Sequence, residues 1–172
     1  MKWYEKFANW ISTRGGKRVM YRPNETGQPA KYLERFYIVK TPFIEIMLHR
    51  FFMSDAGELH DHPWHSFGWI LAKGYNETVL DKNSQEITYF RSVGYFGARS
   101  AKSFHRVQLL ADGVGTTWTV FVTLKRHKNW GFLTTKGWIP FNHYFKSNGT
   151  LEVQELPQHY EGWVFPRKVM TP

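Results

Sequence analysis

Two histidines separated by one residue, His60 and His62, carry the clearest chemical signal in the sequence. Side chains at alternate positions of an extended segment point to the same side, so both imidazoles would face one way. His105 lies in a second apolar run, and a histidine from a neighbouring strand would complete a facial set of three imidazoles. Neutral imidazole is a good ligand for divalent zinc, iron, nickel or copper. The spacing therefore predicts a transition-metal site.

A fourth histidine, His65, follows His62 by three residues. A regular strand would point it to the opposite face, whereas a bulge at Pro63 would return it to the cluster as a fourth ligand. On a regular strand, His65 would instead hydrogen-bond to a ligand from outside the cluster or lie on the surface.

Three further side chains are candidates for work on a substrate. Arg50, if it pointed inward, would bind a carboxylate or phosphate through two parallel hydrogen bonds, and otherwise it would lie at the rim with its head in solvent. Tyr75 and Glu77 either reach the site or pack in the core. Asp61 lies between two of the histidines but alternates to the opposite face, so Glu77 or His65 would have to act as the general base. Side chains that could form a basic mouth near His105 are Arg99, Lys102 and Arg106.

Composition limits the class of protein. The chain has 172 residues, no cysteine and a formal net charge of +9, which fits one domain whose metal ligands are nitrogen or oxygen. The charge favours an anionic partner, and since the basic residues are scattered, a small anion is preferred to nucleic acid. No apolar stretch approaches the length of a membrane span or of a signal peptide, so a cytoplasmic location is the default. Phosphate-binding glycine loops, dinucleotide fingerprints and nucleophile-elbow motifs are absent from the sequence.

The elements that must position these residues are mostly strands. An amphipathic helix is predicted over residues 2–13, with an apolar stripe of Trp3, Phe7, Trp10 and Ile11, and a loop is predicted over 20–30. Apolar and β-branched runs then alternate with turn residues, which favours an antiparallel sandwich or barrel. The last 45 residues are aromatic and irregular, and they would lie across the barrel as a lid, pack as an arm or form a dimer interface. The predicted strands are Tyr32–Lys40, Phe43–Phe52, Ser66–Leu80, Glu86–Val93, Ser103–Leu110 and Thr117–Lys125.

Residues 44–125 resemble the two signature motifs of the cupin superfamily. The first motif is a glycine, five residues, His-x-His, three or four residues, Glu, six residues and Gly, and here His60, His62 and Gly74 match. In the second motif a glycine precedes a histidine by eleven residues, as Gly94 precedes His105. The chain also resembles short uncharacterised cupins of bacterial and phage genomes. Positions that depart from the motifs are Ser54, Phe67, Ser100, Lys102 and Leu109, of which Phe67 replaces the glutamate ligand.

The resemblance implies a cupin-type double-stranded β-helix barrel in a single domain, 1–172. Residues 1–30 would form the N-terminal helix and loop, 31–126 the barrel, and 127–172 an arm that packs on it. It also implies a mononuclear metal site of His60, His62 and His105, and a homodimer is common among cupins. Iron(II) is the favoured metal, with zinc, nickel or manganese as alternatives.

Four functions follow as expectations. Three-histidine cupins are often iron(II) dioxygenases of thiols, diketones or phenolic acids, so dioxygenase chemistry on a small anionic or aromatic substrate is the leading one. A redox-neutral isomerase or hydrolase of a sugar phosphate or nucleotide would use the same cage with the metal as Lewis acid. A module that binds small anions without catalysis is the third, because a fold does not fix function. A scaffold that assembles through its aromatic tail is the fourth.

Overall fold

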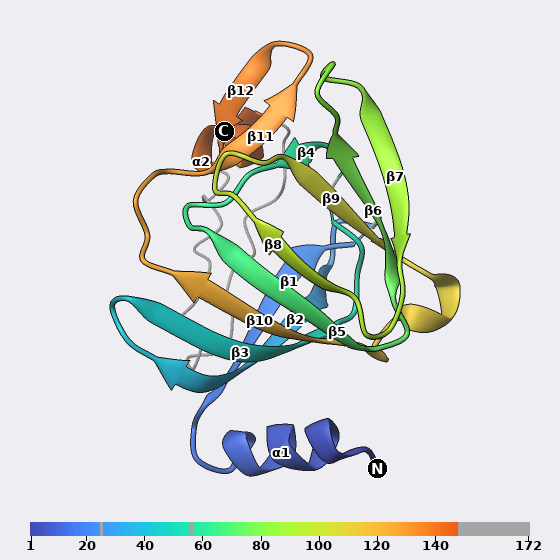
Figure 1. Ribbon diagram of the computed structural model, residues 1–172, viewed down its shortest axis with the longest axis vertical. Coiled ribbons are helices and arrows are strands. Elements are labelled where there is room, and N and C mark those ends of the chain that lie inside the picture. Colours follow the sequence, from blue (N-terminus) through green and yellow to red (C-terminus); the bar gives the residue numbers. More distant parts are fainter. Residues whose placement is uncertain (25, 56, 148–172) are drawn as a thin grey trace, which may run out of the picture.

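Two six-stranded antiparallel sheets form the body of the part of the chain that the structure describes (Figure 1). The structure, a computed structural model, describes residues 1–24, 26–55 and 57–147, so the last part of the predicted arm lies outside the described residues. The first sheet has the order β1 (Lys17–Pro23), β2 (Pro29–Lys40), β3 (Ile44–Phe51), β10 (Thr117–Leu124), β5 (Ser66–Ala72) and β8 (Phe96–Arg99). The second has the order β12 (Gly137–Pro140), β11 (Gly131–Thr134), β4 (Leu59–His60), β9 (His105–Leu109), β6 (Tyr75–Leu80) and β7 (Glu86–Arg91).

The chain passes repeatedly from one sheet to the other. From β4 to β6, and again from β7 to β11, most consecutive strands lie in opposite sheets, so the two sheets are wound together as a double-stranded barrel. Interior side chains of such a barrel can enclose a ligand cavity between the sheets. The predicted all-β, cupin-type barrel is confirmed.

Helix α1 (Trp3–Ser12) covers the outer face of the first sheet. The predicted helix is present, but the buried stripe is Tyr4, Ala8 and Ile11, while Trp3 and Trp10 are 60% and 51% exposed. The helix is rotated from the predicted face because it packs on a cluster formed by Phe36, Leu48 and Trp118 of three strands. A short 3-10 helix (Ala111–Gly113) and helix α2 (Phe141–Ser147) are the other described helices. No described helix is long and apolar enough to cross a membrane.

Two predicted boundaries differ from the structure. The run Ser66–Leu80 is two strands in different sheets, because Lys73 and Gly74 both have positive φ, 67° and 100°, and turn the chain between them. Gly74 is required there, since a Cβ would lie 2.5 Å from the Arg91 carbonyl oxygen.

The predicted loop of residues 20–30 is largely a hairpin. β1 pairs with β2, so the N-terminal segment contributes an edge strand to the barrel. Only the connection is a loop, in which Asn24 Oδ1 accepts hydrogen bonds from the Thr26 and Gln28 backbone amides at 3.0 and 2.9 Å. Short strands β8, β11 and β12 also replace segments that were predicted to be turn or irregular.

Candidate metal centre

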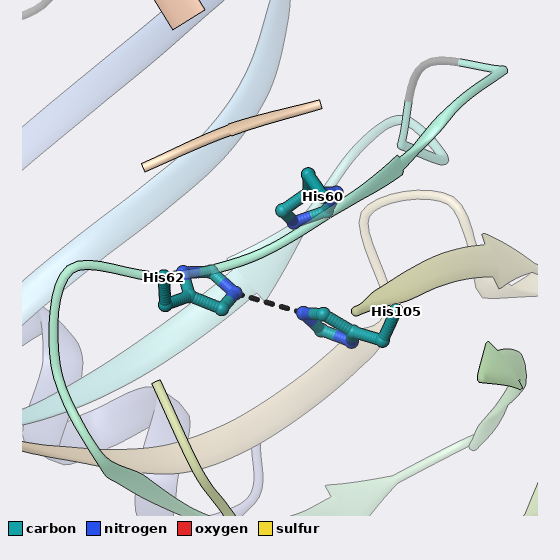
Figure 2. Close-up of side chains that lie close together, drawn as sticks. All are labelled: His60, His62 and His105. Carbon is teal, nitrogen blue, oxygen red and sulfur yellow. Dashed lines mark hydrogen bonds between the residues drawn. The ribbon is translucent and has the colours of Figure 1, made fainter. Parts of the chain in front are cut away.

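The three predicted histidines meet in space. His60 and His105 are directly opposite each other in the β4–β9 pair, and His62 follows two residues after His60. One ligand atom from each ring lies within 4.8 Å of the others, and the Nε2 atoms of His62 and His105 are 2.8 Å apart (Figure 2). The ring centroids are 4.8 to 5.1 Å apart in all three pairs, so the imidazoles form a compact triangle.

The residue between the paired histidines anchors their segment to the barrel. Asp61 is 2% exposed, and its Oδ1 accepts a hydrogen bond from the Gly131 amide at 2.8 Å. Its Oδ2 accepts one from Trp138 Nε1 at 3.2 Å and forms an ion pair with Lys128. β11 and β12 therefore fix the backbone between His60 and His62, although the sequence indicated no strands there.

Glu77 lies behind His105. Its Oε1 is 3.1 Å from His105 Nδ1, so the ring donates Nδ1–H to the carboxylate and directs Nε2 toward the other two histidines. The carboxylate is 1% exposed and is held by Arg91 at 2.9 Å and by Arg99. Glu77 is thus placed to orient a ligand.

All three imidazoles are held neutral at neutral pH. Burial lowers the pKa of His60, and it lowers the pKa of His62 and of His105 well below the usual 6.5. The positive charge of Arg99 acts in the same direction on each pKa. Neutral imidazole nitrogens have a lone pair free for a metal, so the donor set, its convergence and the carboxylate behind His105 fit a divalent transition metal.

A cavity of about 320 Å³ opens next to the histidines. This volume suits a small organic molecule. Tyr75 lines the cavity, and burial raises the pKa of its phenol above the usual 10.0. The other aromatic side chains in the lining are Tyr21, Tyr32, Phe51, Trp64, Phe121, Trp130 and Phe132.

The structure does not bring Arg50 or His65 to the cluster. His49 and Phe51 face the cavity, so Arg50 between them points to the outer face, where its Nε donates to the Gly115 carbonyl at 2.6 Å. His65 is exposed and stacks on His127 with ring centroids 4.9 Å apart. The strand alternation was read in the sequence, but it did not show which set of residues points inward.

The predicted basic mouth is only partly present. Arg99 lines the cavity, whereas Arg106 contacts the Gly57 carbonyl and Glu86 outside it. Lys102 lines a separate surface depression. Arginines of β1 and β2 line the cavity instead. The sequence did not indicate them, because no strand was predicted over β1 and the inward face of the predicted strand Tyr32–Lys40 was not assigned.

Comparison with known proteins gives matches only among solved structures. No family model and no curated protein matches the sequence. The structure of iron(II) HppE is 12% identical with a TM-score of 0.49, over 64% of this chain and 57% of that one. Hydroxypropylphosphonic acid epoxidase from S. wedmorenis with fosfomycin is 14% identical with a TM-score of 0.44, over 54% and 51%. A conserved SPY1581 protein of unknown function from Streptococcus pyogenes is 16% identical with a TM-score of 0.42, over 56% and 76%.

These structural matches are distant, and this chain spans little more than half of the two HppE-type chains. The likeness to a cupin barrel rests on features of this chain itself. Its strand order winds two antiparallel sheets into one barrel, and His60, His62 and His105 meet inside it at the positions of the cupin motifs. The chain therefore has an all-β barrel of cupin type in which three histidines converge.

Proposed function

We propose that the protein binds one divalent metal ion through His60, His62 and His105 and is a mononuclear iron(II) enzyme of dioxygenase type. The observation that carries the proposal is the convergence of three neutral imidazoles at the wall of an aromatic cavity. The described residues offer three ligands and no fourth, which leaves coordination positions for substrate and dioxygen. When bound, iron(II) would supply the activation of dioxygen.

The protein residues around the cluster have separate tasks in this proposal. Glu77 keeps His105 in the tautomer whose Nε2 faces the other ligands. Phe121, Trp130 and Phe132 exclude water and provide flat apolar walls for the body of a small substrate.

Proton-transfer chemistry has weaker support, because the carboxylates beside the cluster are already engaged. Glu77 is held by two arginines and His105. Asp55, which lines the cavity, accepts hydrogen bonds from the Tyr32 hydroxyl at 2.5 Å and the Val107 amide at 2.6 Å. A hydrolase or isomerase would need a general base, so the geometry favours oxygenase chemistry over the redox-neutral alternative.

Metal analysis of protein purified without a histidine tag tests the proposal. After anaerobic loading with iron(II), we expect about one equivalent of iron per chain in the wild type. His62→Ala should lose it, and His65→Ala should keep it, because His65 lies on the surface away from the cluster. Oxygen-consumption screens with small thiols, diketones and aromatic acids would then follow.

Two outcomes would count against the proposal. A wild-type protein that binds no metal after anaerobic loading would overturn it entirely. Stoichiometric zinc, nickel or manganese with no oxygen uptake would overturn the dioxygenase assignment and leave a Lewis-acid enzyme of sugar phosphates or nucleotides.

A further inference from the structure

Two arginines face each other inside the cavity. Arg18 of β1 and Arg35 of β2 are directly paired across the strands, and both line the cavity that contains the histidines. Residues paired in this way have their side chains on the same face of the sheet, and two like charges there are mutually destabilising. The barrel therefore contains two arginines whose charges repel each other, at positions where apolar side chains would pack without this repulsion.

Neither arginine has an acceptor among the described residues. The Nε atoms of Arg18 and Arg35 are buried without a hydrogen-bond partner, and neither guanidinium forms an ion pair with a described carboxylate. Other cavity arginines are satisfied: Arg22 donates to the Ser54 carbonyl at 2.5 Å, and Arg99 pairs with Glu77. A buried donor without an acceptor carries a free-energy penalty that a bound ligand can remove.

The cavity as a whole has an excess of positive charge. Among the described residues its one lining carboxylate is Asp55, which accepts hydrogen bonds from Tyr32 and Val107. An anion that entered would meet little competition from protein groups. The charged side chains of the lining are Arg18, Arg22, Arg35, Arg99, Arg126 and Asp55.

A row of side chains leads from the arginines to the metal centre. His49 is the β3 partner of Arg35, and its Nε2 is also buried without a partner. Burial and the charge of Arg35 hold the pKa of His49 well below 6.5, so its ring is neutral. The His49 ring stacks on Phe121 with centroids 4.9 Å apart, and the His62 ring lies 6.4 Å from Phe121. The arginine pair and the histidines thus occupy different walls of one cavity.

We propose that Arg18 and Arg35 form an oxyanion clamp that holds the acidic group of the substrate. The clamp takes a carboxylate or a phosphate-type group, whose oxygens accept bidentate hydrogen bonds from guanidinium. The apolar or aromatic body of the molecule then extends along Phe121 toward His62. The substrate class is accordingly a small organic acid with one terminal oxyanion, and in that respect the inference rests on the proposed function.

Anion binding by metal-free protein tests the clamp separately from the metal centre. Inorganic phosphate and benzoate are titrated by calorimetry at constant ionic strength, with chloride as the balancing anion. We expect at least one of them to bind the wild type, and Arg35→Gln to weaken that binding by about tenfold or more. Arg18→Gln is the second variant, and Arg14→Gln, at an exposed position in the turn after α1, is the matched control that removes the same charge elsewhere.

A thermal measurement supports the titration. Without added anion, Arg35→Gln should unfold at the wild-type temperature or above, because it removes one of two unpaired like charges. At equal concentration, added phosphate or benzoate should raise the unfolding temperature of the wild type more than that of the variant. Binding of phosphate alone would identify phospho-acids as the class, and binding of benzoate alone would identify carboxylic acids.

His62→Ala separates the clamp from the proposed function. Anion binding that persists in this variant supports the clamp even if the wild type fails to bind iron. Metal binding without binding of either anion would overturn the clamp and leave the metal centre intact. The clamp would also be overturned if Arg14→Gln weakened anion binding as much as Arg35→Gln, or if both cavity variants bound like the wild type.

Discussion

At the scale of single residues, the candidate metal centre has a carboxylate behind it that does not line the cavity. Glu77 contacts His105 Nδ1 at 3.1 Å and is itself compensated by Arg91 and Arg99. Carboxylates behind a histidine ligand fix the tautomer and ring orientation, and their loss commonly lowers metal affinity. Glu77 was expected among residues that act on the substrate, and the structure places it behind His105 and outside the cavity lining, where we propose that it positions the ring.

Glu77→Gln tests that role. The amide can still accept the Nδ1–H of His105 but carries no charge, so the two arginines lose their partner. We expect metal affinity to fall by about 10- to 100-fold, measured by competition with a chelator at a temperature where circular dichroism shows the variant folded. Glu86→Gln, on the exposed side of the same sheet, should bind metal like the wild type. Unchanged affinity in folded Glu77→Gln would contradict the positioning role.

At the scale of elements, two glycines of the cupin-like motifs serve different ends. Gly74 and Gly94 both have positive φ, 100° and 88°. A Cβ at Gly74 would meet the Arg91 carbonyl at 2.5 Å and the Phe90 ring at 3.2 Å, whereas nothing lies within 4 Å at Gly94. Conformation alone explains Gly94, while Gly74 also permits the close approach of the end of β7.

The two alanine variants should therefore differ. Both lose about 1–2 kcal/mol of unfolding free energy from the left-handed conformation, and Gly74→Ala loses more because the backbone of Arg91 must move. Urea unfolding of the two variants and the wild type measures the difference. Equal losses would show that the contact with Arg91 has no energetic consequence.

The outer face of the first sheet carries a buried carboxylate that links β1, β2 and β3. Glu34 of β2 is 3% exposed and accepts from Lys17 at 2.7 Å and Lys31 at 3.0 Å, with Arg50 at 3.8 Å. Burial alone would raise its pKa, but the two lysines outweigh burial and lower the pKa below the usual 4.5. Arg50 thus contributes to the stability of the sheet.

Glu34→Gln should lower the free energy of unfolding by about 1–3 kcal/mol at pH 7. Because the folded pKa is below the unfolded one, the ionised carboxylate stabilises the fold above pH 4.5, and that contribution is lost as pH falls through the folded pKa. The difference between variant and wild type should therefore shrink between pH 7 and pH 3. Urea unfolding over this range would contradict the account if the difference stayed constant or grew.

At the scale of the whole molecule, the long strands of the barrel could be predicted from the sequence and its short strands could not. Long strands such as β2, β3 and β10 have enough residues to show alternation and β-branched enrichment. β4, β8, β11 and β12 have only two to four residues each, and their existence depends on partners far away in the chain. Periodicity cannot report such strands, because pairing rather than local preference forms them.

The same distinction applies to the site. His60 and His62 share one segment and His105 follows a recognisable motif, so the triad could be predicted. The Arg18–Arg35 pair depends on the register of β1 against β2, which no local pattern of residues fixed. The three histidines could be predicted from local motifs. The arginine pair could not, because it forms only when two strands pair in one register.

Iron K-edge X-ray absorption of the anaerobically iron(II)-loaded protein tests the three-histidine centre most directly. Imidazole ligands give multiple-scattering features that water and carboxylate do not. The account predicts strong imidazole scattering from one iron per chain in the wild type, clearly reduced in His105→Ala and unchanged in His65→Ala. A wild-type spectrum without imidazole scattering, or one that His105→Ala leaves unchanged, would contradict the metal centre.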